Sequence, residues 1–167
     1  PGIMVFHPYV LKEFNNRWFM LGKKEGAPRI LTLALDRIEN LKPILAKAYK
    51  KEPFDPNEYY KDTYGVTVMG KKALLNIILE IDRQNAPYVL TKPFHHSQKL
   101  MEELPDGHII ISLQLHHNYE LERLILGFGS SAKVLQPRRL KRRIVHILKN
   151  AVKQYEVDDL SKDGEKP

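Results

Sequence analysis

The sequence contains no cysteine. This absence excludes a disulfide scaffold and a thiolate metal site, and it agrees with a reducing compartment, so we expect a cytoplasmic protein. The sequence also lacks any run of about 18 apolar residues, and its first residues, PGIMVF, lack the charged flank of a signal peptide. We therefore expect no membrane partner.

Acidic residues are fewer than basic ones. The 167 residues include 20 Asp and Glu against 27 Lys and Arg, which gives a net charge of +7. Such an excess is consistent with an anionic partner, although total charge alone does not define a site. The stretch RRLKRR at 138–143 is basic at every position but one, so part of the charge is concentrated there. Hydrophobic residues make up 43% of the chain, enough for a packed core.

The N-terminal part of the chain has the pattern of short strands separated by turns. The runs VFHPYVL, RWFMLG and RILTLALDRI are separated by the asparagine pair 15–16 and by KKEGAP. In RWFMLGK, the strand pleat places Trp18 and Met20 on one face, and Phe19 and Leu21 on the other. We predict a small antiparallel β unit.

A short helix is predicted within FDPNEYYKDTYG. Asp55 and Glu58 have the spacing of a capping box, Pro56 suits the first helical position, and Gly65 can end the helix. The following VTVMGKK reads as a linker.

The second half alternates between strand and helix patterns. ALLNIILEID and HIIISLQLHH have the alternation of strands covered on one side, and QKLMEEL and SAKVLQ are shorter strand candidates. RQNAPYVLTK and NYELERLILGFG read as helices, and a longer helix starts after Pro137. The order β-α-β-β-α-β with a terminal helix predicts a ferredoxin-like layer.

The last helix has two distinct faces at about 100° per residue. Its apolar stripe, which we expect to face the core, consists of Leu140, Ile144, Ile147, Leu148, Ala151, Val152 and Tyr155. The roughly opposite face carries Arg138, Arg142, His146, Lys149 and Lys153. The arginines and lysines are candidate phosphate contacts. A solvated helix face is the more ordinary use of such residues, because no aromatic residue is present to stack a base.

Other candidates for chemistry are weak. The histidine pairs 95–96 and 116–117 suggest a metal, but adjacent strand residues point to opposite faces and cannot easily share an ion. GFGSS follows a predicted helix and lacks the Gly-Lys-Ser/Thr of a phosphate loop, so it favours a helix C-cap. No order of residues supports a catalytic triad or a carboxylate pair. We therefore predict that the protein is not an enzyme and that it has neither a metal site nor a cofactor.

Longer stretches resemble a known family. HPYVLKEFNNRWFMLGK followed by LALDRIENL resembles the core of the WYL domain, whose Trp-Tyr-Leu triplet corresponds here to Trp18, Phe19 and Met20. PFHHSQKL, DGHIIISLQL and ELERLILGFGSSAKVLQPRRLKRRI are similar to the C-terminal extension that follows WYL domains in bacterial transcription regulators. The resemblance extends to about Glu156.

The resemblance implies a fold and a domain organisation. It implies an α+β chain in which an Sm-like β-barrel, the WYL domain at 1–52, is followed by a capped helix and linker at 53–71. A ferredoxin-like extension with a long C-terminal helix occupies 72–156, and we expect a disordered tail at 157–167. We also expect the N-terminal helix-turn-helix and the first barrel strands to be missing, because the sequence is a fragment or because its N-terminal part is not included.

The resemblance also implies partners. In such regulators a winged helix-turn-helix binds promoter DNA, and the WYL domain senses a nucleic-acid or nucleotide effector through aromatic and basic residues. Here the candidate effector-binding residues are His7, Tyr9, Arg17, Trp18, Phe19 and Arg37. Phe19 replaces the tyrosine of the triplet, which removes a hydroxyl that could contact a ligand. We expect a single-stranded nucleic acid or a nucleotide as the effector, and a homodimer as the assembly.

Each candidate effector-binding residue could instead have an ordinary structural role. Trp18 and Phe19 could pack the barrel, and for Trp18 we favour core packing because large aromatic residues in strands are most often buried. Arg37 could simply pair with Asp36 or with another nearby acidic residue. For His7, Arg17 and Arg37 we favour a functional role.

Three functions fit the sequence. The first is the sensory module of a transcription regulator. The second is a plain oligomerisation module of the same regulator, and a nucleic-acid-processing enzyme is a distant third.

Overall fold

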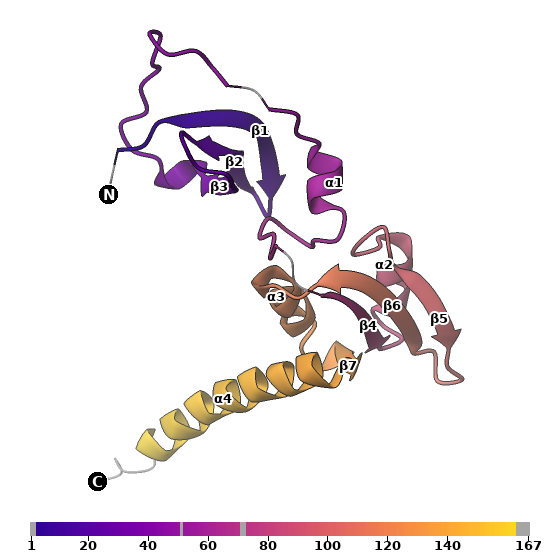
Figure 1. Cartoon of the computed structure of the whole chain (residues 1–167). Helices are drawn as coiled ribbons and strands as arrows, with labels where there is room; N and C mark the ends of the chain where they lie inside the picture. The colour runs from indigo at the N-terminus through magenta and orange to yellow at the C-terminus, as the bar shows by residue number, and fades with distance from the viewer. Residues whose placement is uncertain (1–2, 51, 71–72, 163–167) are drawn as a thin grey trace. The chain divides into compact units, whose positions relative to one another are not determined.

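A computed structural model describes residues 3–50, 52–70 and 73–162, with side chains up to Glu156 (Figure 1). It divides the chain into two compact units, Pro1–Gly70 and Lys71–Pro167. The helix and linker predicted at 53–71 thus fall almost entirely within the first unit. Within the described ranges, no helix combines the length and the apolar character needed to cross a membrane.

The first unit contains a three-stranded antiparallel sheet. Its strands are β1 (Phe6–Phe14), β2 (Arg17–Lys24) and β3 (Ile30–Ala34), in the order β1-β2-β3. Asn15 and Asn16 connect the first two strands with φ values of 52° and 59°. Asparagine tolerates this left-handed conformation, which is typical of a two-residue hairpin turn. The predicted β unit is therefore present.

The predicted Sm-like barrel is not confirmed. In the described part of the chain the sheet is open, with β1 and β3 at its two edges, and three strands are too few to close a barrel. The predicted strand RILTLALDRI is also shorter than expected. It ends at Ala34 and is followed by a 3₁₀ turn, η1 (Leu35–Arg37).

One face of this sheet is covered by the chain that follows it. Leu21 is fully buried on this face. The ammonium group of Lys12 lies 4.4 Å from the centre of the Tyr60 ring, and Phe14 meets Tyr64 edge-on with 5.7 Å between ring centres. Aromatic residues from the segment after the sheet therefore supply much of this small core.

The helix α1 (Pro56–Tyr60) belongs to this covering segment. The side chain of Asp55 accepts hydrogen bonds from the backbone N–H groups of Asn57 and Glu58, as the predicted cap requires. The helix is shorter than predicted, because it ends at Tyr60 rather than near Gly65. Glu58 pairs with Lys61, one turn on, at 2.9 Å.

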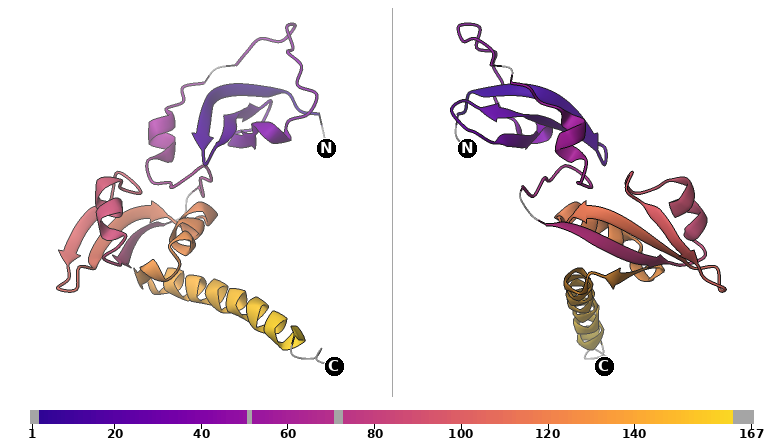
Figure 2. Two further views of the ribbon diagram at one scale, coloured as in Figure 1. Left: turned by 180° about the vertical axis from the view of Figure 1, so that it is seen from behind. Right: turned by 45° about the vertical axis from the view of Figure 1, so that its right-hand side comes forward.

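The second unit has the predicted order of elements. These are β4 (Leu74–Ile81), α2 (Ala86–Thr91), β5 (Lys99–Glu103), β6 (Ile109–His116), α3 (Tyr119–Gly127), η2 (Gly129–Ser131), β7 (Ala132–Gln136) and α4 (Arg138–Lys162). The sheet order is β5-β6-β4-β7, and every neighbouring pair is antiparallel. The two helices α2 and α3 are the crossover connections between strands (Figures 1 and 2).

Alternating residues of the two central strands form the core of this unit. The side chains buried there include Ile77, Leu79, Ile81, Ile109, Ile111, Leu113 and Leu115. Helix α3 adds Leu121 and Ile125, and Asn118 caps its start by accepting a hydrogen bond from the N–H of Leu121 at 2.9 Å. The buried carboxylate of Glu122 accepts hydrogen bonds from the Nε of Arg143 at 3.2 and 3.3 Å, which ties α3 to α4.

The apolar stripe of α4 enters the core only over its first turns. Leu140 and Ile144 are buried, whereas Leu148, Ala151, Val152 and Tyr155 are exposed. Figures 1 and 2 show why: only the start of α4 lies beside the sheet of its own unit. The expectation that the whole stripe faces the core is therefore wrong. The helix also continues to Lys162, into the predicted disordered tail, and residues 163–167 lie outside the described part.

Candidate nucleic-acid interface

Trp18 lies on the face of the first sheet opposite to buried Leu21. Its neighbours there follow from the strand register, which pairs Leu11 with Met20 and Met20 with Leu33. The side chain of Trp18 is 52% exposed. The expectation that it packs into a core is therefore wrong: tryptophan fits a strand equally well on an open face, and the sequence does not reveal which face is covered.

Two arginines and one acid lie at the same end of this sheet. Ala34 pairs with Phe19, so η1, which follows directly, lies beside the start of β2. The Nη2 atom of Arg17 is 3.0 Å from the Oδ2 atom of Asp36, and both side chains are about half exposed. Asp36 therefore pairs with Arg17. The alternative interpretation, in which Asp36 pairs with Arg37, is wrong. Arg37 is exposed and makes no ion pair with any described residue.

Phe19 and Arg17 belong to the covered face of the sheet. Their positions alternate with that of Trp18, and Phe19 is half-buried. Arg17 can reach a ligand on the Trp18 side only around the end of the sheet. Phe19 contributes to packing, and the structure does not present its ring beside that of Trp18.

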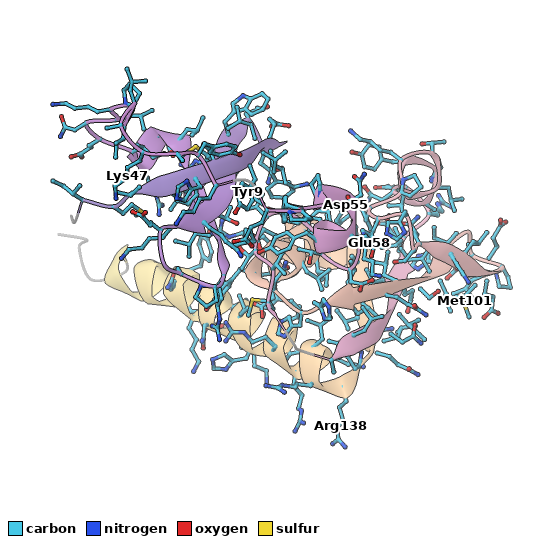
Figure 3. The ribbon with its side chains drawn as sticks, turned by 45° about the horizontal axis from the view of Figure 1, so that its top comes forward. Tyr9, Lys47, Asp55, Glu58, Met101 and Arg138 are labelled. Carbon is cyan, nitrogen blue, oxygen red and sulfur yellow. The ribbon has the colours of Figure 1, made fainter. Side chains whose placement is uncertain are left out.

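His7 and Tyr9 lie toward the other end of the sheet. His7 pairs across the strands with Lys23, six residues along β2 from Arg17, a separation of about 20 Å. His7 is buried, and its Nδ1 accepts a hydrogen bond from the backbone N–H of Lys50 at 3.3 Å. Tyr9, labelled in Figure 3, occupies the bulge of β1, and its ring centre is 5.8 Å from that of Phe54. The predicted effector residues thus form two groups.

Ion pairs surround the His7 end of the sheet, and sequence reasoning did not identify them. Lys23 pairs with Glu52, and Lys47, labelled in Figure 3, pairs with Glu25 at 2.7 Å. The hydrogen bond from Lys47 holds the pKa of Glu25 below its ordinary value. The partners come from a stretch, KAYKKE, with neither helical nor strand periodicity. No sequence pattern therefore predicts which charges meet.

The first turns of α4 form a second, strongly basic surface. Four exposed side chains contribute to it, Arg138, Arg139, Lys141 and Arg142, and none of them makes an ion pair with a described residue. Figure 3 shows Arg138 pointing away from the ribbon. Positive charges at a helix N-terminus oppose the helix dipole, so these residues do not stabilise α4. Lys149 and Lys153 lie two to three turns farther along and are also exposed.

The histidine pairs make different contacts from those expected. His95 and His96 lie in a turn rather than in a strand, and their ring centres are 4.0 Å apart, so they do not point to opposite faces. The Nε2 of His117 is 2.6 Å from the Oε1 of Glu122. Over the described residues, no three His, Cys, Asp or Glu side chains come together in a way that could hold a metal ion.

Comparison with known proteins shows what most of the second unit is similar to. Residues 73–152 match the family model of the WCX domain, the C-terminal extension associated with WYL domains. This segment is similar to WCX domains, and the match confirms the predicted resemblance to WYL-domain regulators. No curated protein is significantly similar in sequence to the chain.

Among the solved structures that are similar to the chain, one is described here by its measures of similarity. It is the proteasome accessory factor B/C (PafBC) of Arthrobacter aurescens, with 19% sequence identity and a TM-score of 0.43. The alignment covers 90% of this chain and 22% of that one, so the chain spans about a fifth of the length of PafBC. A similarity at this level does not establish a shared function.

Proposed function

We propose that the chain is the sensory part of a transcription regulator and that its first unit binds a single-stranded nucleic acid or a nucleotide. The WCX domain supports the regulatory assignment, because this domain is the extension associated with WYL domains. The proposed regulator binds promoter DNA through a separate helix-turn-helix. The first unit then supplies the effector site, and no catalytic step is involved.

The exposed ring of Trp18 is the observation that carries this proposal. An aromatic side chain on an open strand face is a suitable platform for a base, and each stacked base contributes about 1 to 3 kcal/mol. Arg37 and Arg17 lie at the same end of the sheet and supply positive charge for a phosphate. Along the strand, His7 is about 20 Å from Arg17 and Tyr9 about 13 to 16 Å. Tyr9 therefore contacts the same ligand only if it is an oligonucleotide of several residues, and the buried His7 is not among the contacts that we propose.

The single tryptophan makes the test direct. The chain has one Trp, so its fluorescence reports on this position alone. We expect a short single-stranded oligonucleotide to quench it. We also expect Arg37→Ala to weaken binding and to reduce the slope of log K against log salt by about one, because one phosphate contact is lost. Circular dichroism establishes that each variant is folded.

The basic start of α4 is the rival location. The double variant Arg138→Ala with Arg142→Ala serves as the comparison for Arg37→Ala, over the same salt series. Loss of binding in the double variant with unchanged binding in Arg37→Ala would contradict the site on the sheet. A bound oligonucleotide that leaves the fluorescence of Trp18 unchanged would contradict it as well.

A further inference from the structure

The excess positive charge of the chain lies in one segment. Residues 123–155 contain nine Lys and Arg and no Asp or Glu, so this segment carries +9 while the whole chain carries +7. The remaining residues together are therefore slightly acidic. Two of the nine cations are paired within the second unit, Arg143 with Glu122 and Lys133 with Glu80. The other seven are exposed: Arg123, Arg138, Arg139, Lys141, Arg142, Lys149 and Lys153.

Four of these exposed cations form a row along α4, which we call the basic ridge. At about 100° per residue, Arg138, Arg142, Lys149 and Lys153 lie within about 60° of one another around the helix axis. None of them makes an ion pair with a described residue. At 1.5 Å per residue, the basic ridge is about 22 Å long. Its first member, Arg138, points away from the ribbon in Figure 3.

The basic ridge does not stabilise the helix that carries it. Arg138 and Arg142 are four residues apart, as are Lys149 and Lys153, and like charges at this spacing repel each other along a helix. Arg138 and Arg142 also lie in the first turns of α4, where the positive end of the helix dipole adds to the repulsion. An anionic partner would relieve this repulsion, so the ridge is suited to binding.

The residue types on the basic ridge favour a nucleic-acid duplex over a single strand. Proteins that bind single strands combine basic residues with aromatic side chains on which bases stack. Tyr155 is the only Phe, Tyr or Trp between Arg138 and Glu156, and it lies about 130° around the helix from the middle of the ridge. B-form DNA presents a phosphate charge about every 1.7 Å of its axis, so a row of this length can meet several phosphates.

The surroundings of the basic ridge also favour a duplex over an anionic membrane. A basic amphipathic helix binds a lipid surface by inserting apolar side chains beside its charges. Beside Arg138 and Arg142, the apolar side chains of α4 are Leu140 and Ile144, and both are buried in the second unit. Exposed apolar side chains of this helix begin only at Val145. The most strongly charged part of α4 therefore has no described apolar side chain that could enter a membrane.

We propose that the basic ridge of α4 binds the phosphate backbone of double-stranded DNA without reading its sequence. Each of its four side chains contacts a phosphate, and none contacts a base edge. This contact adds sequence-independent affinity to that of the helix-turn-helix in the proposed regulator. The ridge itself is independent of the effector site, which is on the first unit and depends on Trp18.

Binding of a short labelled duplex of arbitrary sequence to the 167-residue chain, followed by anisotropy over a salt series, tests the proposal. Four phosphate contacts predict a slope of log K against log salt of about −4. Arg138→Gln with Arg142→Gln should reduce this slope by about two and weaken binding at low salt by about tenfold or more. Lys149→Gln with Lys153→Gln should have the same effect, because the two pairs belong to one row.

The matched control removes two positive charges from exposed positions elsewhere in the chain. Arg29→Gln with Arg83→Gln lowers the net charge by the same amount and should leave the affinity and the slope unchanged. The ridge variants should unfold at the wild-type temperature or above it, because they remove like-charge repulsion. They should also keep the quenching of Trp18 by a single-stranded oligonucleotide, so that failure of the ridge is distinguishable from failure of the effector site.

Several outcomes would overturn the proposal. One is duplex binding by either ridge variant that is as tight as that of the wild type. Another is an equal loss of binding in the control, which would show that only total charge matters. Equally tight binding of poly-L-glutamate would indicate an unselective surface for polyanions. Binding to phosphatidylserine vesicles without binding to the duplex would identify a membrane as the partner instead.

Discussion

At the scale of single residues, Gly22 shows how closely two strands of the first unit approach. A Cβ atom at this position would lie 2.1 Å from the backbone oxygen of His7 and 2.8 Å from the ring of Phe6. The first of these atoms belongs to the backbone and cannot move aside as a side chain can. A glycine is therefore required by close packing rather than by its φ angle, and a sequence shows only the glycine, not the reason for it.

We predict that Gly22→Ala destabilises the first unit by about 1 to 3 kcal/mol, because it overpacks the β1–β2 pair. Urea unfolding followed by the fluorescence of Trp18 measures this, since the reporter is on β2 itself. Gly127→Ala is the matched control: Gly127 ends α3, and no atom lies within 4 Å of a Cβ placed there. Equal stability of Gly22→Ala and the wild type would refute the steric argument.

At the residue scale the candidate site was only partly predictable. The sequence indicated a Trp-containing strand and a nearby arginine, and the structure does place Arg37 at the end of the sheet that carries Trp18. The sequence could not indicate that Trp18 is exposed, because periodicity assigns residues to two faces of a strand without saying which face is covered. It also could not indicate that Asp36 pairs with Arg17, since this contact depends on a 3₁₀ turn.

At the scale of elements, Asp82 joins three neighbouring segments. It follows β4, its backbone N–H donates to the carbonyl of Ser131 in η2, and its carboxylate accepts two hydrogen bonds of 2.9 Å from Asn85 just before α2. A hydrogen bond with the Ser131 side chain, followed by those from Asn85, lowers the pKa of Asp82 from 3.8 to about 2. The ionised carboxylate is thus the form that the folded state favours.

The lowered pKa predicts a specific pH dependence. A carboxyl group whose pKa is depressed on folding contributes stability above its unfolded pKa and loses that contribution as the pH falls through its folded pKa. We expect wild type to be more stable than Asp82→Asn at pH 5 and above, with the difference shrinking between about pH 4 and pH 2. Urea midpoints of both proteins across this range measure it. A difference that stays constant down to pH 2 would contradict the assignment.

The elements of the second unit were more predictable than those of the first. Its strands and helices have clear periodicity, because each buries one face against the others. In the first unit, α1 ends five residues before Gly65 and β3 ends at Ala34, since local turn geometry decided both boundaries. Helix α4 shows a different limit of prediction from sequence. Its stripe was recognised correctly, but the sequence cannot tell a stripe that enters the core from one that faces outward.

At the scale of the whole molecule, the two units differ greatly in how much apolar surface they bury. Of the 17 buried apolar side chains among the described residues, only Leu21, Tyr60 and Val66 belong to the first unit, and 14 belong to the second. Burial of apolar side chains is the main favourable contribution to folding. Most of the stability therefore resides in the second unit.

Because of this difference, we predict that the second unit folds independently of the first. Residues 71–167 expressed alone should show helical and strand signals and a single cooperative unfolding transition. In the whole chain, amide exchange should be slower in β4 and β6 than in β1 and β3, because segments with few buried contacts open first. An unfolded fragment, or equal protection of the two sheets, would show that the first unit supplies stability that its own small core does not explain.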